Sequence, residues 1–252
     1  HKRRFYPEQK NALAEAMLAY LREIDGAPVE AIPAGLTDLL FSATSSAGHI
    51  RDRFSMDGWA ALADLAKTAR NMRKTARAGD DAAQAMSVLL RKITGFTGLV
   101  HENMYRFTSW RFLTIGKALE RAIGMSEFLA DFAVQGAPDG SYDMAIEVGD
   151  SVMAHRRRYS ILTSRESVIS MLALDSDNPR SIVYNLEAIR DQIERLPQDA
   201  GDGSMSEAMR AILPLHANLA VLHPEDVDAR TLRDVADGVG QLYTILSSRY
   251  LR

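Results

Sequence analysis

Apolar residues recur every three to four positions along almost the whole chain, the spacing that gathers them on one face of an α-helix. No stretch shows the strict alternation of apolar and polar residues that predicts a half-buried β-strand. Glycine, proline, serine and asparagine separate the helical segments. The pattern predicts helices near residues 7–26, 36–53, 55–78, 81–106, 110–133, 142–159, 165–174, 178–196, 205–222 and 229–250.

The predicted fold class is therefore all-α. Helices of these lengths joined by short loops favour an antiparallel multi-helix bundle. The segment near 110–133 is apolar around most of its circumference, because Trp110 and Phe128 lie on a different side of the helix from Phe112. We expect this segment to be the buried central helix of the bundle.

Four sites predict where helices begin or bend. Ser55 and Ser164 precede helical segments and suit the N-cap position, because a serine hydroxyl accepts a hydrogen bond from a free backbone N–H of the first turn. Asn178 followed by Pro179 predicts another helix start, with proline at the first helical position. Pro214 lies inside a helical segment and predicts a kink there.

The length of 252 residues fits a single helical domain over 1–252. Within it we expect residues 1–35 to form an N-terminal helix and loop, and residues 198–204 to form a flexible linker before the last two helices. No apolar run is long enough to span a membrane, so we expect a cytoplasmic location. The chain begins at His1 without an apolar segment after its first basic residues, which predicts an internal fragment or a processed chain and no secretory signal.

Composition and charge exclude several classes of protein. The absence of cysteine removes disulfides, thiolate metal sites and cysteine nucleophiles. The 30 basic and 33 acidic residues give a net charge of −3, which is not typical of a protein that binds nucleic acid over its whole surface. The charge is uneven, however: residues 1–126 hold 18 basic and 13 acidic residues, whereas residues 127–252 hold 12 and 20.

Motifs for cofactor chemistry are missing from the sequence. The two glycine-rich phosphate-binding patterns are Gly-x-x-x-x-Gly-Lys-Ser/Thr and Gly-x-Gly-x-x-Gly, and neither occurs at the start of a helix after a strand. No Glu-x-x-His pair provides ligands for a di-iron centre. The six histidines are scattered without ligand spacing, so no metal site is expected. We also expect no cofactor in this chain, and the sequence favours a protein that is not an enzyme.

Four basic residues recur at steps of three and four residues and share one face of the third helix: Lys67, Arg70, Lys74 and Arg77. We call them the basic stripe. Cations near the end of a helix complement its dipole, which is one interpretation. The other is a surface for an anionic partner. No aromatic residue is interleaved with the stripe, which argues against single-stranded nucleic acid.

The segment near 110–133 also carries charges at positions flanked by apolar residues, namely Arg111, Glu120 and Arg121. Buried charges are costly unless they are paired, so each should meet a partner from another helix. One interpretation is an ion network that fixes helix register, and the other is a polar centre that binds a ligand. The candidate residues for either are Arg111, Glu120, Arg121, Arg157, Arg180 and Arg51.

The stretch from Trp110 to Ala122, which reads Trp-Arg-Phe-Leu-x-x-Gly-x-x-Leu-Glu-Arg-Ala, resembles the bacterial alpha-E domain family, an all-helical family named for a Glu-Arg motif. The similarity covers roughly residues 36–250. The family usually opens with an earlier Glu-Arg helix that this chain does not contain, so we expect the chain to lack that first helix or to belong to a divergent branch. Further segments match in the same order: His49–Ser55 with Trp59, Asp150-Ser151 with Arg156–Tyr159, and Asp177–Ser181.

The resemblance implies a functional context and no specific reaction. Alpha-E domains are found beside or fused to circularly permuted ATP-grasp proteins, and near transglutaminase-like peptidases. That context implies a non-catalytic partner or substrate-presenting domain that works with an amide or peptide ligase, whose ATP and Mg²⁺ would belong to the ATP-grasp protein. The alternative is an enzyme or ligand-binding bundle that uses an Arg/Glu centre to bind a carboxylate or a phosphate.

Overall fold

The computed structural model describes residues 34–77, 80–159, 162–197 and 204–250. All regular elements in these ranges are helical, which confirms the predicted fold class. The chain divides into two compact units, residues 1–106 and residues 107–252. The helix expected near 7–26 and most of the linker expected at 198–204 lie outside the described residues, and the single domain over 1–252 stays a prediction.

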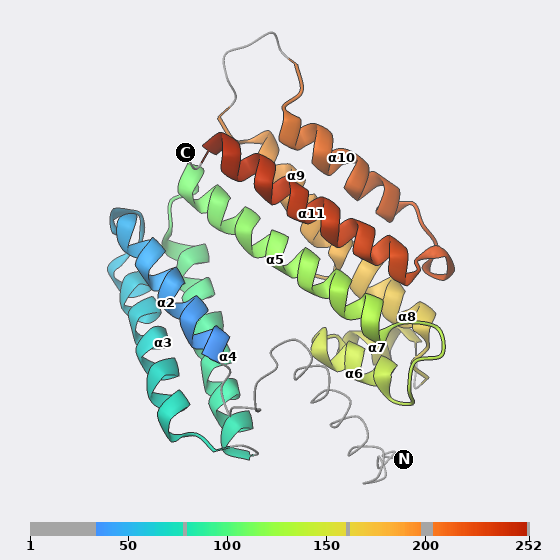
Figure 1. The fold of residues 1–252 in the computed structure, drawn as a ribbon, viewed down its shortest axis with the longest axis horizontal. Coiled ribbons are helices and arrows are strands. Elements are labelled where there is room, and N and C mark those ends of the chain that lie inside the picture. The colour runs from blue at the N-terminus through green and yellow to red at the C-terminus, as the bar shows by residue number, and fades with distance from the viewer. Residues whose placement is uncertain (1–33, 78–79, 160–161, 198–203, 251–252) are drawn as a thin grey trace. The chain divides into compact units, whose positions relative to one another are not determined.

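The first unit contains a small helical arrangement in which α3 packs against both α2 and α4 (Figure 1). Its core is formed by Leu65 and Ala69 from α3 and by Ala85 and Leu89 from α4. Ser55 caps α3 by accepting a hydrogen bond from the backbone N–H of Gly58, as predicted. The elements are α2 (Ala34–His49), the short 3₁₀ helix η1 (Arg51–Arg53), α3 (Met56–Thr75) and α4 (Asp80–Asn103).

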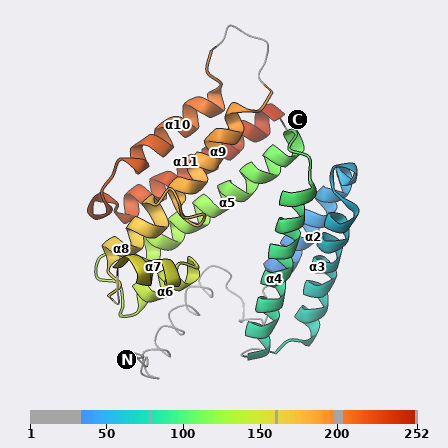
Figure 2. The same ribbon diagram turned by 180° about the vertical axis from the view of Figure 1, so that it is seen from behind.

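The second unit is built on four long helices that close into a ring (Figures 1 and 2). Helix α5 packs against α9 and α11, and α10 packs against the same two helices. Helix α5 runs antiparallel to α11, since the aromatic side chain of Phe112 near the start of α5 lies 5.3 Å from that of Tyr250 at the end of α11. It also runs antiparallel to α9, since Arg111 near the start of α5 donates to Gln192 near the end of α9. The antiparallel bundle is thus confirmed. The ring helices are α5 (Thr108–Phe132), α9 (Ile182–Glu194), α10 (Glu207–Ala220) and α11 (Ala229–Tyr250).

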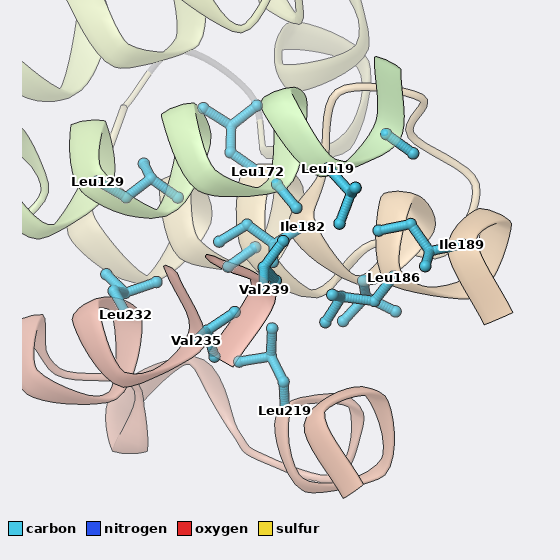
Figure 3. Close-up of a cluster of buried hydrophobic side chains, with 14 of the residues drawn as sticks. Leu119, Leu129, Leu172, Ile182, Leu186, Ile189, Leu219, Leu232, Val235 and Val239 are labelled. Atoms are coloured by element: carbon cyan, nitrogen blue, oxygen red, sulfur yellow. The ribbon is translucent and has the colours of Figure 1, made fainter. Parts of the chain in front are cut away.

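The core of this bundle is assembled from one apolar stripe of each helix, together with Leu172 (Figure 3). Helix α5 contributes Leu119 and Leu129, which are nearly inaccessible to solvent. Burial of this much aliphatic surface is the main stabilising term, at about 25 cal/mol per Å². The other labelled members come from α9, α10 and α11, namely Ile182, Leu186, Ile189, Leu219, Leu232, Val235 and Val239.

Short elements connect α5 to α9. They are α6 (Ser141–Val148), α7 (Val152–Tyr159), α8 (Arg165–Ile169) and a π-helical turn η2 (Ser170–Leu174), while the 3₁₀ turn η3 (Pro224–Asp226) precedes α11. Ser164 caps α8, as predicted. Arg165 fastens these connections, because its guanidinium donates to the backbone carbonyls of Ala133, Pro224 and Val227.

Two local predictions are wrong. The single helix expected near 142–159 is divided into α6 and α7 at Gly149 and Asp150. Gly149 packs so tightly that a Cβ atom there would lie 2.4 Å from Leu172 Cδ2, and Asp150 has a left-handed φ of 49°. The spacing of apolar residues carries no information about such a close approach, so the predicted helix continued through residues 149 and 150.

The second error concerns the start of α9. Asn178 and Pro179 lie in a turn before the helix, and the N-cap is Ser181, whose hydroxyl accepts from the Tyr184 backbone N–H. Asn178 is used elsewhere: its amide group donates to Ser151 Oγ and to the Met171 carbonyl. Helix α10 runs through Pro214 as one continuous element.

Candidate functional site

The three charged residues of α5 do not share a site. Arg111 is half-buried and donates to Gln192 Oε1 at 3.1 Å, which ties the start of α5 to the end of α9. Glu120 is exposed, so the expectation that it is buried against a partner is wrong. Arg121 is half-buried and belongs to a different group of charges.

Arg121 lies among cations. Burial lowers the pKa of the Arg121 guanidinium, and repulsion by Arg180 lowers it further, while the Tyr184 hydroxyl acts in the opposite direction. Lys117 lies one helical turn earlier and retains an exposed surface. Burial of part of its side chain lowers the pKa of Lys117, and repulsion by Arg121 lowers it further. We call Lys117, Arg121 and Arg180 the cation cluster.

The structure therefore brings together only two of the predicted site residues, Arg121 and Arg180. Arg157 is exposed on α7, and Arg51 belongs to the other compact unit, where its guanidinium lies 5.1 Å from the centre of the Trp59 ring. Sequence reasoning missed Lys117, although its position four residues before Arg121 places both on one helix face.

The basic stripe is solvent-exposed along its whole length. Helix α3 ends at Thr75 and the backbone is extended at Ala76, so the expectation that all four residues share one helix face is wrong for Arg77. No ion pair joins any of its four residues to a carboxylate of the described chain. The nearest acidic residue on the helix, Asp64, pairs with Lys92 of α4 and does not neutralise the stripe. Arg70 is oriented by Phe41 of α2, whose ring centre lies 3.8 Å from the guanidinium carbon.

A surface hollow of about 320 Å³ adjoins the stripe. Its charged members are three cations and one carboxylate, so the hollow has a net positive charge. The lining residues are Thr37, Asp38, Phe41, Arg70, Arg73 and Lys74.

A buried histidine–serine pair in the second unit has a structural role. His155 Nε2 lies 2.9 Å from Ser167 Oγ, and both residues are buried. Ser167 Oγ donates to the Ser164 carbonyl and accepts from the Ser164 backbone N–H, as part of the capping box of α8. Because the hydroxyl proton is committed to that carbonyl, His155 donates to Ser167 and does not activate it as a nucleophile.

The same histidine predicts a loss of stability in acid. Burial lowers the pKa of His155 against an opposing effect of Asp143, and burial and Arg190 lower the pKa of His216. A histidine held neutral in the native state takes up its proton more readily in the unfolded state. Stability is therefore full above the ordinary pKa of about 6.5 and falls as the pH drops through it.

We expect the free energy of unfolding, measured by urea denaturation from pH 7.5 to pH 5, to decrease toward acid. The decrease should be smaller in a His155→Gln variant, in which the amide can still donate to Ser167. His223→Gln is the matched control, because His223 is exposed. Equal acid sensitivity in His155→Gln and the native protein would contradict the assignment.

Within the described ranges, no group of three or more histidine and acidic side chains is placed to hold a metal ion. No helix in those ranges combines the length and the apolar character that crossing a membrane requires.

Comparison with known proteins assigns the chain to a family. It is 25% identical over 204 residues to uncharacterized proteins of Mycobacterium tuberculosis and Mycobacterium bovis. The match covers 78% of this chain but 23% of those relatives, so the chain spans less than a quarter of their length. No solved structure matches the chain significantly. Residues 27–251 match Alpha-E, described as a predicted alpha-helical domain with a conserved ER motif, and the Glu120-Arg121 pair lies within them. The chain therefore belongs to the Alpha-E family.

Proposed function

We propose that this chain is a non-catalytic partner or substrate-presenting domain that works with an ATP-grasp type amide or peptide ligase, and that it docks through the basic stripe. In this proposal ATP and Mg²⁺ belong to the ligase, and both proteins act in the cytoplasm. A transglutaminase-like peptidase is a further partner in the same context. The observation that carries the proposal is the basic stripe itself, four exposed cations without a carboxylate partner in the described chain.

The chemistry of the stripe suits an acidic protein surface. Lys67, Arg70 and Lys74 follow α3 at steps of three and four, so their charges form a row about 10 Å long at 1.5 Å per residue, and Arg77 follows the end of the helix. The guanidinium carbon of Arg70 lies 3.8 Å from the Phe41 ring centre, and a guanidinium placed over an aromatic ring can still make a bidentate contact with a carboxylate. Residues 1–106 have 15 basic and 12 acidic residues, so the stripe lies in the net positive unit.

The relatives support a domain that serves a larger protein. Because the matched segment is less than a quarter of the mycobacterial proteins, the helical domain there is accompanied by a much longer sequence. A domain of this kind fits an accessory role beside other domains.

The test is binding of the purified chain to the ATP-grasp protein encoded beside it, measured by biolayer interferometry over a series of salt concentrations. We expect the double variant Lys67→Gln/Lys74→Gln to bind about tenfold more weakly at low salt, since each exposed ion pair contributes about 0.2–1 kcal/mol. Affinity of the native chain should fall as salt rises.

The matched control is Arg53→Gln/Lys92→Gln, which removes the same charge from cations already paired with Asp52 and Asp64. Docking through the stripe requires that this control bind like the native chain. Equal weakening in both double variants would show that the net charge of the chain, and not the basic stripe, determines binding. Tight binding of the native chain to a single-stranded oligonucleotide and none to the ligase would assign the stripe to nucleic acid.

A further inference from the structure

The hollow of about 320 Å³ beside the basic stripe is built by two helices that lie side by side, α2 and α3 (Figure 1). The start of α2 faces the end of α3. On each helix one lining residue is three and four positions away from the other two, so the three side chains share a face. They are Thr37, Asp38 and Phe41 on α2, and Arg70, Arg73 and Lys74 on α3.

Two of the three cations are positioned by residues of the opposite helix. The guanidinium carbon of Arg70 lies 3.8 Å from the centre of the Phe41 ring. Arg73 Nη1 donates to Thr37 Oγ1 at 3.3 Å, and Thr37 is buried, so this contact lies on the inner side of the hollow. Charged groups that are held in place before binding lose less entropy when a ligand arrives.

The hollow also contains a carboxylate that does not neutralise these cations. Asp38 lines it together with the three basic side chains, yet among the described residues no ion pair joins Asp38 to any cation. Complementing the helix dipole explains cations near the end of α3, but it requires neither a hollow nor a carboxylate within it. Opposite charges that share a hollow without pairing are available to different groups of one ligand.

The spacing of the cations favours two anionic groups over one. Arg70 precedes Lys74 by one helical turn, so their backbone positions are about 6 Å apart along α3 at 1.5 Å per residue. A guanidinium grips a carboxylate in bidentate fashion, and a lysine adds a point charge. A short aliphatic chain with a carboxylate at each end can span this distance and cover the Phe41 ring, which is 36% exposed.

We propose that the hollow binds an acidic amino acid of the glutamate type. The two carboxylates of the ligand contact the three cations, and its ammonium group pairs with Asp38. The ligand has two negative charges and one positive charge, which complement the three cations and the one carboxylate of the lining. The volume lies at the lower end of the range for ligand pockets, about 300–1,000 Å³, and suits a ligand of this size.

This inference deepens the proposed function and rests on it in one respect. An amide ligase joins a carboxylate to an amine, and an amino acid contains both groups, so a domain that presents substrate to such a ligase would hold a ligand of this class. The stripe and the hollow share Arg70 and Lys74, whereas Arg73 belongs to the hollow alone. Ligand binding is therefore measured on the chain without the ligase, so that failure of docking and failure of ligand binding are observed separately.

The experiment is an NMR titration of the whole isotope-labelled chain in low-salt buffer, which detects weak binding and locates it. The probes are L-glutamate, glutarate, L-glutamine and inorganic phosphate. We expect saturable chemical-shift changes with glutamate at the backbone N–H groups that line the hollow. Glutamine should bind at least about fivefold more weakly, since an amide replaces one carboxylate. Tighter binding of phosphate than of glutamate would contradict a site for two separate carboxylates.

The variant Arg73→Gln should bind glutamate about fivefold more weakly, as expected for the loss of an exposed ion pair, while its amide can still donate to Thr37. Arg70→Gln is a second variant with the same expected result. Arg91→Gln is the matched control, because Arg91 is exposed in the same unit, donates to Ser87 Oγ and does not line the hollow. Circular dichroism of each variant verifies that it is folded.

Asp38→Asn tests the contact with the ammonium group. Glutarate has the two carboxylates of glutamate but no ammonium group, so the substitution should weaken glutamate binding and strengthen glutarate binding. The ratio of the glutamate Kd to the glutarate Kd should therefore rise about threefold.

The proposal is overturned if glutamate causes no saturable change, if the changes lie outside the hollow, or if Arg73→Gln and Arg91→Gln bind glutamate equally. An unchanged Kd ratio in Asp38→Asn would also overturn it. Absence of glutamate binding together with salt-dependent docking to the ligase would refute this inference alone. Glutamate binding without docking would refute only the docking.

Discussion

Replacing Arg165 with methionine is expected to lower the free energy of unfolding by about 3 kcal/mol, since a hydrogen bond from a charged donor contributes about 1.5–3 kcal/mol. The guanidinium donates to three carbonyls from separate parts of the chain: Ala133 follows α5, while Pro224 and Val227 lie around η3. Methionine keeps the aliphatic stem but leaves all three acceptors without their donor. The loss is partial for each acceptor because Arg165 is only half-buried and water can reach the site.

Urea denaturation followed by circular dichroism measures this change. Arg210→Met is the matched control, because Arg210 is exposed and donates to a single carbonyl, that of Met205, at 3.0 Å. We expect the control to lose less than about 1 kcal/mol. Similar losses in the two variants would show that Arg165 does not join the segments energetically.

The second large effect is expected where α6 ends. A Gly149→Ala substitution should destabilise the protein by about 2 kcal/mol, the usual cost of overpacking a core. The backbone is not the cause, since φ at Gly149 is −72° and suits alanine. The cause is Leu172, which is completely buried and whose Cδ2 and Cδ1 would lie 2.4 and 2.9 Å from the new Cβ, together with the Ala145 carbonyl oxygen at 3.2 Å.

A double-mutant cycle isolates this contact. Leu172→Ala alone should cost about 3 kcal/mol through the cavity that it leaves. The double variant should cost about 3 kcal/mol instead of the additive 5, because the alanine methyl at 149 then fills part of that cavity. Gly124→Ala is the control: Gly124 lies in α5 with no atom within 4 Å of a Cβ, so alanine should stabilise the helix by about 0.5–1 kcal/mol. Strict additivity of the two costs would contradict the proposed clash.

The helices were predictable because their apolar stripes are long and regular. Ser55 and Ser164 also gave correct starts, since a serine hydroxyl at an N-cap acts locally. The two wrong boundaries depend on long-range contacts. Gly149 lies against Leu172, and the Asn178 amide group donates to Ser151 Oγ and to the Met171 carbonyl. A local pattern contains neither partner.

The candidate site was predictable only in part, for a related reason. Helical periodicity gives the angle between two side chains of one helix, but it does not give the direction of the neighbouring helices. Arg111, Glu120 and Arg121 all interrupt apolar positions, yet they have three different surroundings: a glutamine, solvent and other cations. The convergence of Arg180 on Arg121 requires the turn before α9, which the sequence pattern placed inside the helix.

The contact between Phe112 and Tyr250 has a consequence for how this bundle can be joined to other proteins. The chain enters the four-helix bundle at the start of α5 and leaves it at the end of α11. The aromatic rings of Phe112 and Tyr250, which mark these two points, lie 5.3 Å apart. Both connections are thus made at one end of the bundle. The bundle can be inserted into a loop of a host protein without separating the ends of that loop, and a short peptide between residues 250 and 107 would allow a circular permutant that starts at residue 204.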